Sequence, residues 1–246
     1  MVTLLLALFA SPAQAETPDE VIAKAREANR VESSIQTIRM TIASKSGSER
    51  VREVELKSRR EGDVVKSYMR ITSPADIAGT QLLLVDNPGK SDQQMLYLPA
   101  YKRVNFISGA GRKGSFVGSD FSFEDFEIRE AAGGTHKITS DTAEAWVVET
   151  TLTDSDTSYT KISATIGKAD LVVKKVEFYD ATGLLKVLEV TKTAKDGAVT
   201  LPIETTMTNV QKGTKTKLEI VAHKLNVPKT ELPDDTFTQA YLERGG

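Results

Sequence analysis

The chain has 246 residues, and its 32 basic and 34 acidic residues leave a formal net charge of −2. No long run of either sign stands apart, so nucleic acid is excluded as a main partner, because phosphate binding needs a clustered basic face. The sequence contains no cysteine, which excludes disulfides, thiolate metal sites, cysteine nucleophiles and a lipid-modified cysteine at a mature N-terminus.

Residues 1–15 have the pattern of a secretory signal peptide. An apolar run from Val2 to Ala10 precedes the small-residue motif Ala13-Gln14-Ala15, and charged sequence starts at Glu16. The run is too short to span a bilayer. We therefore expect cleavage before Glu16 and a soluble mature protein in the periplasm of a two-membrane bacterium. The alternative is a buried first helix or strand.

One helix and then many strands are predicted in the mature chain. Thr17 is a candidate N-cap with Pro18 at the first helical position, which together with the apolar spacing predicts a helix over about 18–34. From Ile38 onward apolar residues recur at every second position, which is typical of strands with one solvent-exposed face. About 10 or 11 strands joined by short turns follow, and Asp234 is placed to cap a last helix over about 235–243.

This order of elements predicts a mainly β fold in one domain, built as an antiparallel meander that curves strongly or closes in part into a barrel. Its inward side would be lined by apolar side chains: Met40, Ile42, Leu56, Met69, Ile71, Leu82, Leu84, Leu96, Leu98, Val104 and Phe106. Helices and side chains can fill such a hollow as a closed core, or a ligand can occupy part of it. The alternation of apolar and polar residues does not decide between a closed core and a ligand cavity.

The segment GSFVGSDFSFEDFE, Gly114 to Glu127, concentrates aromatic rings. It holds four of the eight phenylalanines, which are Phe116, Phe121, Phe123 and Phe126. Ser119 or Asp120 is placed to cap a short helical turn. We interpret the segment as a flap that turns its rings inward, with Gly111, Gly114 and Gly118 as hinges.

Nothing in the sequence favours an enzyme. His136 and His223 lie outside any metal or catalytic motif. The acidic residues of the 114–127 segment lack the spacing of a calcium loop, and their closeness in sequence is no sign of a catalytic carboxylate pair. We predict no catalytic residue, no metal site and no cofactor.

The strand pair QQMLYLPAYKRVNFIS, followed by the core G-S-D-F-S-x-E-D at Gly118 to Asp125, resembles the outer-membrane lipoprotein-sorting proteins, the LolA-like family of periplasmic carriers. The ending ELPDDTFTQAYLER is also similar, so the likeness covers most of residues 16–246. It implies a single-domain unclosed half-barrel, with the N-terminal helix and short lid helices over an apolar cavity. It does not place the cavity arginine of the founding carrier, because no arginine here lies in a matching motif.

The resemblance implies a carrier that binds acyl chains of lipoproteins or lipids and moves them towards the outer membrane. Its partners would be this cargo, an inner-membrane transporter of the ABC or RND type and an outer-membrane acceptor, and we expect a monomer. The alternative is an accessory or assembly subunit of an RND-type envelope exporter that binds a protein partner or another hydrophobic cargo. For the carrier, Phe121→Ser and Phe123→Ser are expected to weaken binding of an acyl probe with little loss of folding.

Overall fold

The structure of the chain is a computed structural model that describes residues 16–87, 92–126, 134–153 and 156–245. The predicted signal peptide and Glu127 lie outside the described residues. No helix within these ranges is long and apolar enough to cross a membrane.

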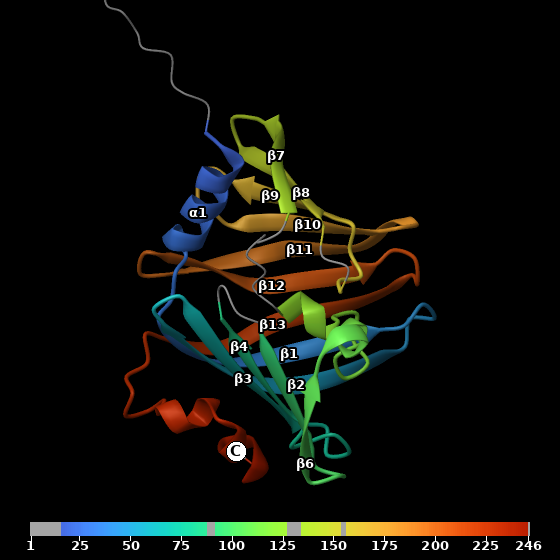
Figure 1. Cartoon of the computed structure of the whole chain (residues 1–246), viewed down its shortest axis with the longest axis vertical. Coiled ribbons are helices and arrows are strands. Elements are labelled where there is room, and N and C mark those ends of the chain that lie inside the picture. The colour runs from blue at the N-terminus through green and yellow to red at the C-terminus, as the bar shows by residue number, and fades with distance from the viewer. Residues whose placement is uncertain (1–15, 88–91, 127–133, 154–155, 246) are drawn as a thin grey trace, which may run out of the picture.

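The strands of the described residues form one antiparallel sheet (Figure 1). They are β1 (Ser33–Ala43), β2 (Glu49–Glu61), β3 (Val64–Ser73), β4 (Gln81–Asp86), β5 (Gln93–Leu98), β6 (Arg103–Ile107), β7 (Gly134–Asp141), β8 (Ala145–Leu152), β9 (Lys161–Gly167), β10 (Val173–Asp180), β11 (Gly183–Asp196), β12 (Val199–Asn209) and β13 (Thr214–Leu225). Their order is β6-β5-β4-β3-β2-β1-β13-β12-β11-β10-β9-β8-β7. This sheet confirms the predicted mainly β, unclosed half-barrel fold, with 13 strands in place of the 10 or 11 expected.

The chain enters the sheet in its middle. β1 pairs with β2 on one side and with β13 on the other, so that Met40 lies opposite both Arg52 and Leu218. The chain then runs outward to the edge strand β6, while the next strand, β7, forms the opposite edge. The connection from β6 to β7 must therefore pass over one face of the sheet. Its described part, residues 108–126, is called the crossover, and the face that it covers is called the inner face (Figure 1).

Helix α1 (Pro18–Ala28) begins as predicted. The Thr17 hydroxyl accepts from the Glu20 backbone N–H, and the Glu20 carboxylate accepts from the Thr17 N–H, which is a capping box. The predicted end near residue 34 is wrong, because Asn29 leaves the helix. Its side-chain amide donates to the carbonyls of Asp170 and Leu171, and its Oδ1 accepts from the backbone N–H of Thr200.

Helix α1 lies over the far end of the inner face, on β8 and β9 (Figure 1). The fully buried Val21 packs in one cluster with Trp146 and Val148. Val148 and Leu152 lie on the same side of β8, and Leu152 packs against the crossover residue Phe121 and its neighbours. The helix and the crossover therefore cover the same face of the sheet.

The C-terminal segment packs on the opposite, outer face. In place of one helix over 235–243 it forms a short 3-10 turn, η3 (Asp234–Phe237), and helix α2 (Gln239–Glu243). Thr238 interrupts them with extended backbone, and its hydroxyl caps α2 by accepting from the Tyr241 N–H. The buried residues of this segment pack with those of β3–β5, and together they are Leu232, Phe237, Leu242, Tyr68, Leu83 and Met95.

Candidate functional site

The inner face of β1–β5 is apolar and buried beneath the crossover. One cluster of buried side chains joins five residues predicted to face inward with Val54 and two crossover phenylalanines: Met40, Ile42, Ile71, Leu82, Leu84, Val54, Phe116 and Phe123. Met69, Leu96 and Phe126 are partly buried against it. Leu56 is half-buried on the same face, where it pairs in register with Met69. Leu98 is half-buried at the end of β5.

Two residues that were expected on this face lie elsewhere. Val104 packs against the outer-face cluster, and Phe106 is 63% exposed. The reason is the turn between β5 and β6, which pairs Leu98 with Arg103. Because side chains alternate between the faces, this register turns Val104 and Phe106 away from the face of Leu96. Asn105, the partner of Leu96, and Ile107 take the inner positions instead.

A second cluster continues the inner face across β9–β13. It contains Phe121, Tyr159, Phe178 and Met207, and Leu218 of β13 packs against both clusters. The alternation in the C-terminal half of the sequence would have pointed to Phe178, Met207 and Leu218, but the predicted set ended at β6. The sequence interpretation thus located only half of this surface.

The four crossover rings lie together. The ring centroids of Phe116 are 5.9 Å from Phe123 and 5.2 Å from Phe126, both edge-on, and Phe121 stacks on Phe126 at 5.8 Å. Phe116, Phe121 and Phe123 are at most 8% exposed. The rings therefore join the sheet clusters as core side chains. This burial also raises the expected loss of folding free energy when Phe121 or Phe123 is replaced, which the sequence alone predicted to be small.

Polar contacts, in addition to its rings, fix the crossover to the sheet. The Asp120 carboxylate accepts from the hydroxyls of Thr214 and Thr216 at the start of β13, the second at 2.7 Å. The Asp120 backbone N–H donates to Thr216 Oγ1 at 2.9 Å. A half-buried carboxylate with this many donors is well compensated by the protein. Asp120 therefore anchors the crossover to β13.

Asp125 and Lys186 form a buried ion pair between the crossover and β11. Lys186 Nζ lies 2.6 Å from Asp125 Oδ2, and the two side chains are 5% and 2% exposed. Ser122 donates to the same carboxylate oxygen through its backbone N–H and its hydroxyl, at 2.7 and 2.9 Å. The Tyr159 hydroxyl donates to Asp125 Oδ1 at 2.5 Å. Both charges are thus compensated by partners that lie on three different segments of the chain.

The third acidic residue of the motif has the same role. Glu124 is 3% exposed, and its Oε2 accepts from the Thr157 hydroxyl and the Ser158 backbone N–H, both at 3.0 Å. Of the three glycines predicted as hinges, Gly118 has a φ of +75°, which favours glycine, while Gly111 and Gly114 have ordinary backbone. The hinge role of these glycines stays a prediction.

The buried Tyr159 makes a pH dependence testable. Burial, followed by the charge of Asp125, raises the pKa of Tyr159 above its ordinary value of 10.0. The unfolded state therefore loses this proton first, and the contribution to stability is complete below about pH 10 and is lost as the pH rises further. We expect Tyr159→Phe to make the fall in the free energy of unfolding above pH 10 shallower, by up to about 1.4 kcal/mol per pH unit. Urea unfolding at several pH values measures both slopes, and equal slopes would contradict the assignment.

The sequence did not single out Arg52, which the register places beside Met40 on the inner face. Arg52 is 8% exposed, and its Nε is fully buried without a hydrogen bond. Within the described residues its guanidinium has no hydrogen bond or ion pair. Because a buried cation normally has a partner, this is a candidate contact for the polar end of a ligand.

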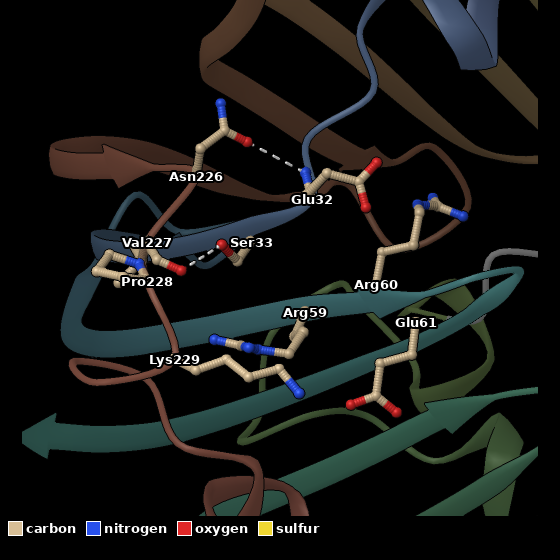
Figure 2. Close-up of a pocket in the computed structure, with 9 residues that line it drawn as sticks. All are labelled: Glu32, Ser33, Arg59, Arg60, Glu61, Asn226, Val227, Pro228 and Lys229. Atoms are coloured by element: carbon tan, nitrogen blue, oxygen red, sulfur yellow. Dashed lines mark hydrogen bonds between the residues drawn. The ribbon is translucent and has the colours of Figure 1, made fainter.

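A pocket of about 460 Å³, lined mostly by charged and polar residues, lies away from the inner-face clusters, where the ends of β1 and β2 meet the segment after β13 (Figure 2). Most of its charged residues already have partners inside the chain, whereas Arg60 is half-buried and its Nε has no hydrogen bond. Arg59 donates to the Leu232 carbonyl at 2.5 Å, and Lys229 lies 2.8 Å from Asp234. Glu61 is paired with Lys66. The pocket is therefore a junction that attaches the C-terminal segment, and it is not the apolar cavity that the family resemblance implies.

The two histidines lie apart and have local partners. His136 Nδ1 is 2.9 Å from Thr150 Oγ1, and His223 Nε2 is 3.2 Å from Asp196 Oδ2. In the described ranges no group of three or more histidine, aspartate or glutamate side chains is arranged to hold a metal ion.

Comparisons with known proteins place this architecture among solved relatives. A domain assigned to the outer membrane lipoprotein-sorting proteins, from Vibrio parahaemolyticus, is 30% identical with a TM-score of 0.82, and the match covers 92% of this chain and 97% of that one. A DUF1329 family protein from Desulfovibrio piger has a TM-score of 0.84 at 21% identity, over 90% and 96% of the two chains. A LolA superfamily protein from Nitrosomonas europaea has a TM-score of 0.70 at 21% identity, over 92% and 100%.

Sequence comparison adds one family match. A family profile with the description "Uncharacterized protein" matches residues 63–244. No curated protein sequence gives a significant match.

Proposed function

We propose a carrier function for this chain, which belongs to the LolA-like family of outer-membrane lipoprotein-sorting proteins. The protein would be a soluble, non-enzymatic periplasmic carrier that binds acyl chains of lipoproteins or lipids and moves them towards the outer membrane. The observation that supports this most is the inner face. Its apolar clusters run over both halves of an unclosed sheet, and the crossover and helix α1 cover them.

The energetics of acyl chains explain why a carrier needs such an apolar face. Keeping one methylene from water is worth about 0.8 kcal/mol, so a 16-carbon chain left in water would cost on the order of 12 kcal/mol. Flexible and branched side chains can cover such a chain without fixed polar contacts. The proposed acyl contacts are Met40, Ile42, Leu56, Met69, Ile71, Leu82, Leu84, Leu96 and Leu98, with Phe116, Phe121, Phe123 and Phe126 from the crossover.

The two covers of the inner face differ in how they are attached. The crossover is fixed by Asp120, Glu124 and Asp125 in addition to its buried rings. Helix α1 contributes one fully buried side chain, Val21, with Ile22 and Ala25 partly buried beside it. Because few buried contacts mean a low cost of local opening, we propose that α1, and not the phenylalanine segment, moves to admit cargo.

Acyl binding is the property that tests the proposal. We expect protein purified from its own periplasm to release fatty-acyl species on lipid extraction and native mass spectrometry, and the emptied protein to bind a fluorescent fatty-acyl probe. Val21→Ser should raise the rate of probe uptake by loosening α1, while Ile35→Ser, under the C-terminal segment on the outer face, should not. Protein that carries no lipid and takes up no probe would overturn the carrier function.

Arg52 would meet the polar end of the cargo. Replacing it with methionine keeps the length of the side chain and removes an unpartnered buried charge. We expect the free energy of unfolding to stay the same or to rise by about 1 kcal/mol, while affinity for an ionised fatty acid falls about 10-fold. Affinity for the matching fatty alcohol should not change.

Isothermal titration with both ligands measures this difference in affinity. Arg39→Met, which removes an exposed arginine on the other side of β1, is the matched control. If Arg52→Met weakens both ligands equally, the guanidinium does not contact the polar end.

A further inference from the structure

The turn and second strand of the β5–β6 hairpin expose two aromatic rings. Tyr101, in the turn, is 68% exposed, and Phe106, on β6, is 63% exposed. The other large hydrophobic side chains exposed in the described residues are all valines, at 50% or less. A large aromatic side chain that stays this exposed stands out, because such rings contribute most to stability when buried.

The same part of the chain is free of negative charge. No acidic residue occurs between Asp92 and Asp120, whereas four basic residues do, namely Lys102, Arg103, Arg112 and Lys113. The stretch between Glu204 and Glu219 also lacks acidic residues and has three lysines, but it contains no aromatic residue. Lys102 and Arg103 are exposed, and neither has an ion-pair partner in the described part of the structure. The hairpin, with the adjoining turn η1 (Gly109–Lys113), is therefore a basic and aromatic surface on a nearly neutral protein.

The place of this surface in the fold makes it accessible. β6 is an edge strand, so one side of the hairpin has no neighbouring strand. Figure 1 shows the hairpin at one end of the long axis of the molecule, at the opposite end from β7. A planar surface can therefore approach Tyr101 and Lys102 without contact with α1, which lies towards β7.

We propose that this hairpin surface, Tyr101 to Lys113, docks the protein onto a membrane that contains anionic lipid. Tyrosine and phenylalanine rings partition into the headgroup region of a bilayer, and lysine and arginine beside them are attracted to negatively charged headgroups. A protein partner would instead be expected to select a contiguous apolar patch with few charges at its centre, whereas here Lys102 and Arg103 lie between the two rings in the sequence. Because Arg103 and Phe106 point to opposite faces of β6, the membrane would meet the hairpin along its edge and turn. Docking of this kind does not depend on acyl cargo and goes beyond the carrier function.

Vesicle binding tests this docking directly. We expect the purified protein to co-float with vesicles made of three parts phosphatidylethanolamine and one part phosphatidylglycerol, and not with vesicles of phosphatidylcholine alone. Raising the salt concentration should weaken the binding, because the attraction between exposed charges is screened. Failure to float with the anionic vesicles at low salt would overturn the proposal.

Paired variants identify the surface. Lys102→Gln with Arg103→Gln should weaken vesicle binding about 25-fold, since each cation near an anionic surface contributes roughly a factor of five. Tyr101→Ser with Phe106→Ser should weaken it about 10-fold or more. The matched controls are Lys212→Gln with Lys215→Gln, two exposed cations at the β12–β13 turn, and Val51→Ser with Val221→Ser. If the controls weaken binding as much as the hairpin variants, the hairpin is not the docking surface.

A fluorescent reporter gives an independent measurement on folded protein. Tyr101→Trp should show a blue shift on addition of anionic vesicles, against the constant background of Trp146, which is 8% exposed in the α1 cluster. An unchanged spectrum with bound vesicles would place the contact elsewhere. The acyl-probe assay on the hairpin variants should remain at the wild-type level, so failure of docking and failure of the carrier function give different results.

Discussion

Replacing Lys186 with methionine is expected to lower the free energy of unfolding by about 3–5 kcal/mol. The substitution leaves Asp125 as a buried carboxylate without its cation, and only the donors from Ser122 and Tyr159 remain. Since Asp125 is 2% exposed, water cannot replace the ammonium group without opening the crossover. Urea denaturation followed by circular dichroism measures the loss.

A second ion pair provides the control. Lys192 and Glu204 are joined at 3.0 Å, but the lysine side chain is 64% exposed, so Lys192→Met should cost less than about 1 kcal/mol. Adding Asp125→Asn to Lys186→Met should recover part of the loss, because it removes the unpaired charge. If Lys186→Met costs no more than Lys192→Met, the buried pair does not hold the crossover.

Phe121→Ser and Phe123→Ser are each expected to cost about 3–5 kcal/mol of folding free energy, in contrast to the small loss that the sequence alone indicated. The two rings are 6% and 8% exposed, and they belong to different clusters, on β9–β13 and on β1–β4. Each serine therefore leaves a cavity and adds a hydroxyl to an apolar site. Denaturation of the two variants measures these losses separately.

The matched control is Phe106→Ser, which changes a phenylalanine that is 63% exposed and should stay within about 0.5 kcal/mol of wild type. A fatty acid at saturating concentration should raise the melting temperature of the Phe121→Ser and Phe123→Ser proteins less than that of wild type, because each variant has lost a proposed acyl contact. If both variants unfold like Phe106→Ser, the rings are not part of the core.

Local pattern predicted the strands well and their long-range partners poorly. The alternation around Met40, Ile42 and Leu82 gave the correct face because each of these residues lies in the interior of a regular strand. It gave the wrong face for Val104 and Phe106, because the length of the turn between β5 and β6 decides which residues of β6 point inward. The helix expected to reach residue 34 failed for a related reason, since the contacts of Asn29 to distant loops end it.

The candidate site depended on contacts that no local pattern contains. Asp120 and Thr216 are 96 residues apart in sequence, and Lys186 and Asp125 are 61 residues apart. The acidic residues of the phenylalanine segment therefore looked like helix caps, and Arg52 looked like any arginine on an alternating strand. Only the order of the strands, with β6 and β7 at opposite edges, explains why that segment must lie across the sheet.

The pairing of β1 with β13 affects how the protein folds during its synthesis. Ser34 pairs with Leu225, so the central strand pair of the sheet joins segments from nearly opposite ends of the polypeptide. A contact of such long sequence separation forms slowly, because the entropy of closing the loop is lost before the pairing contributes. A nascent chain thus exposes the free edge of its first strand until the thirteenth has emerged, and it is during this interval that aggregation or binding by a folding helper would compete with the native pairing.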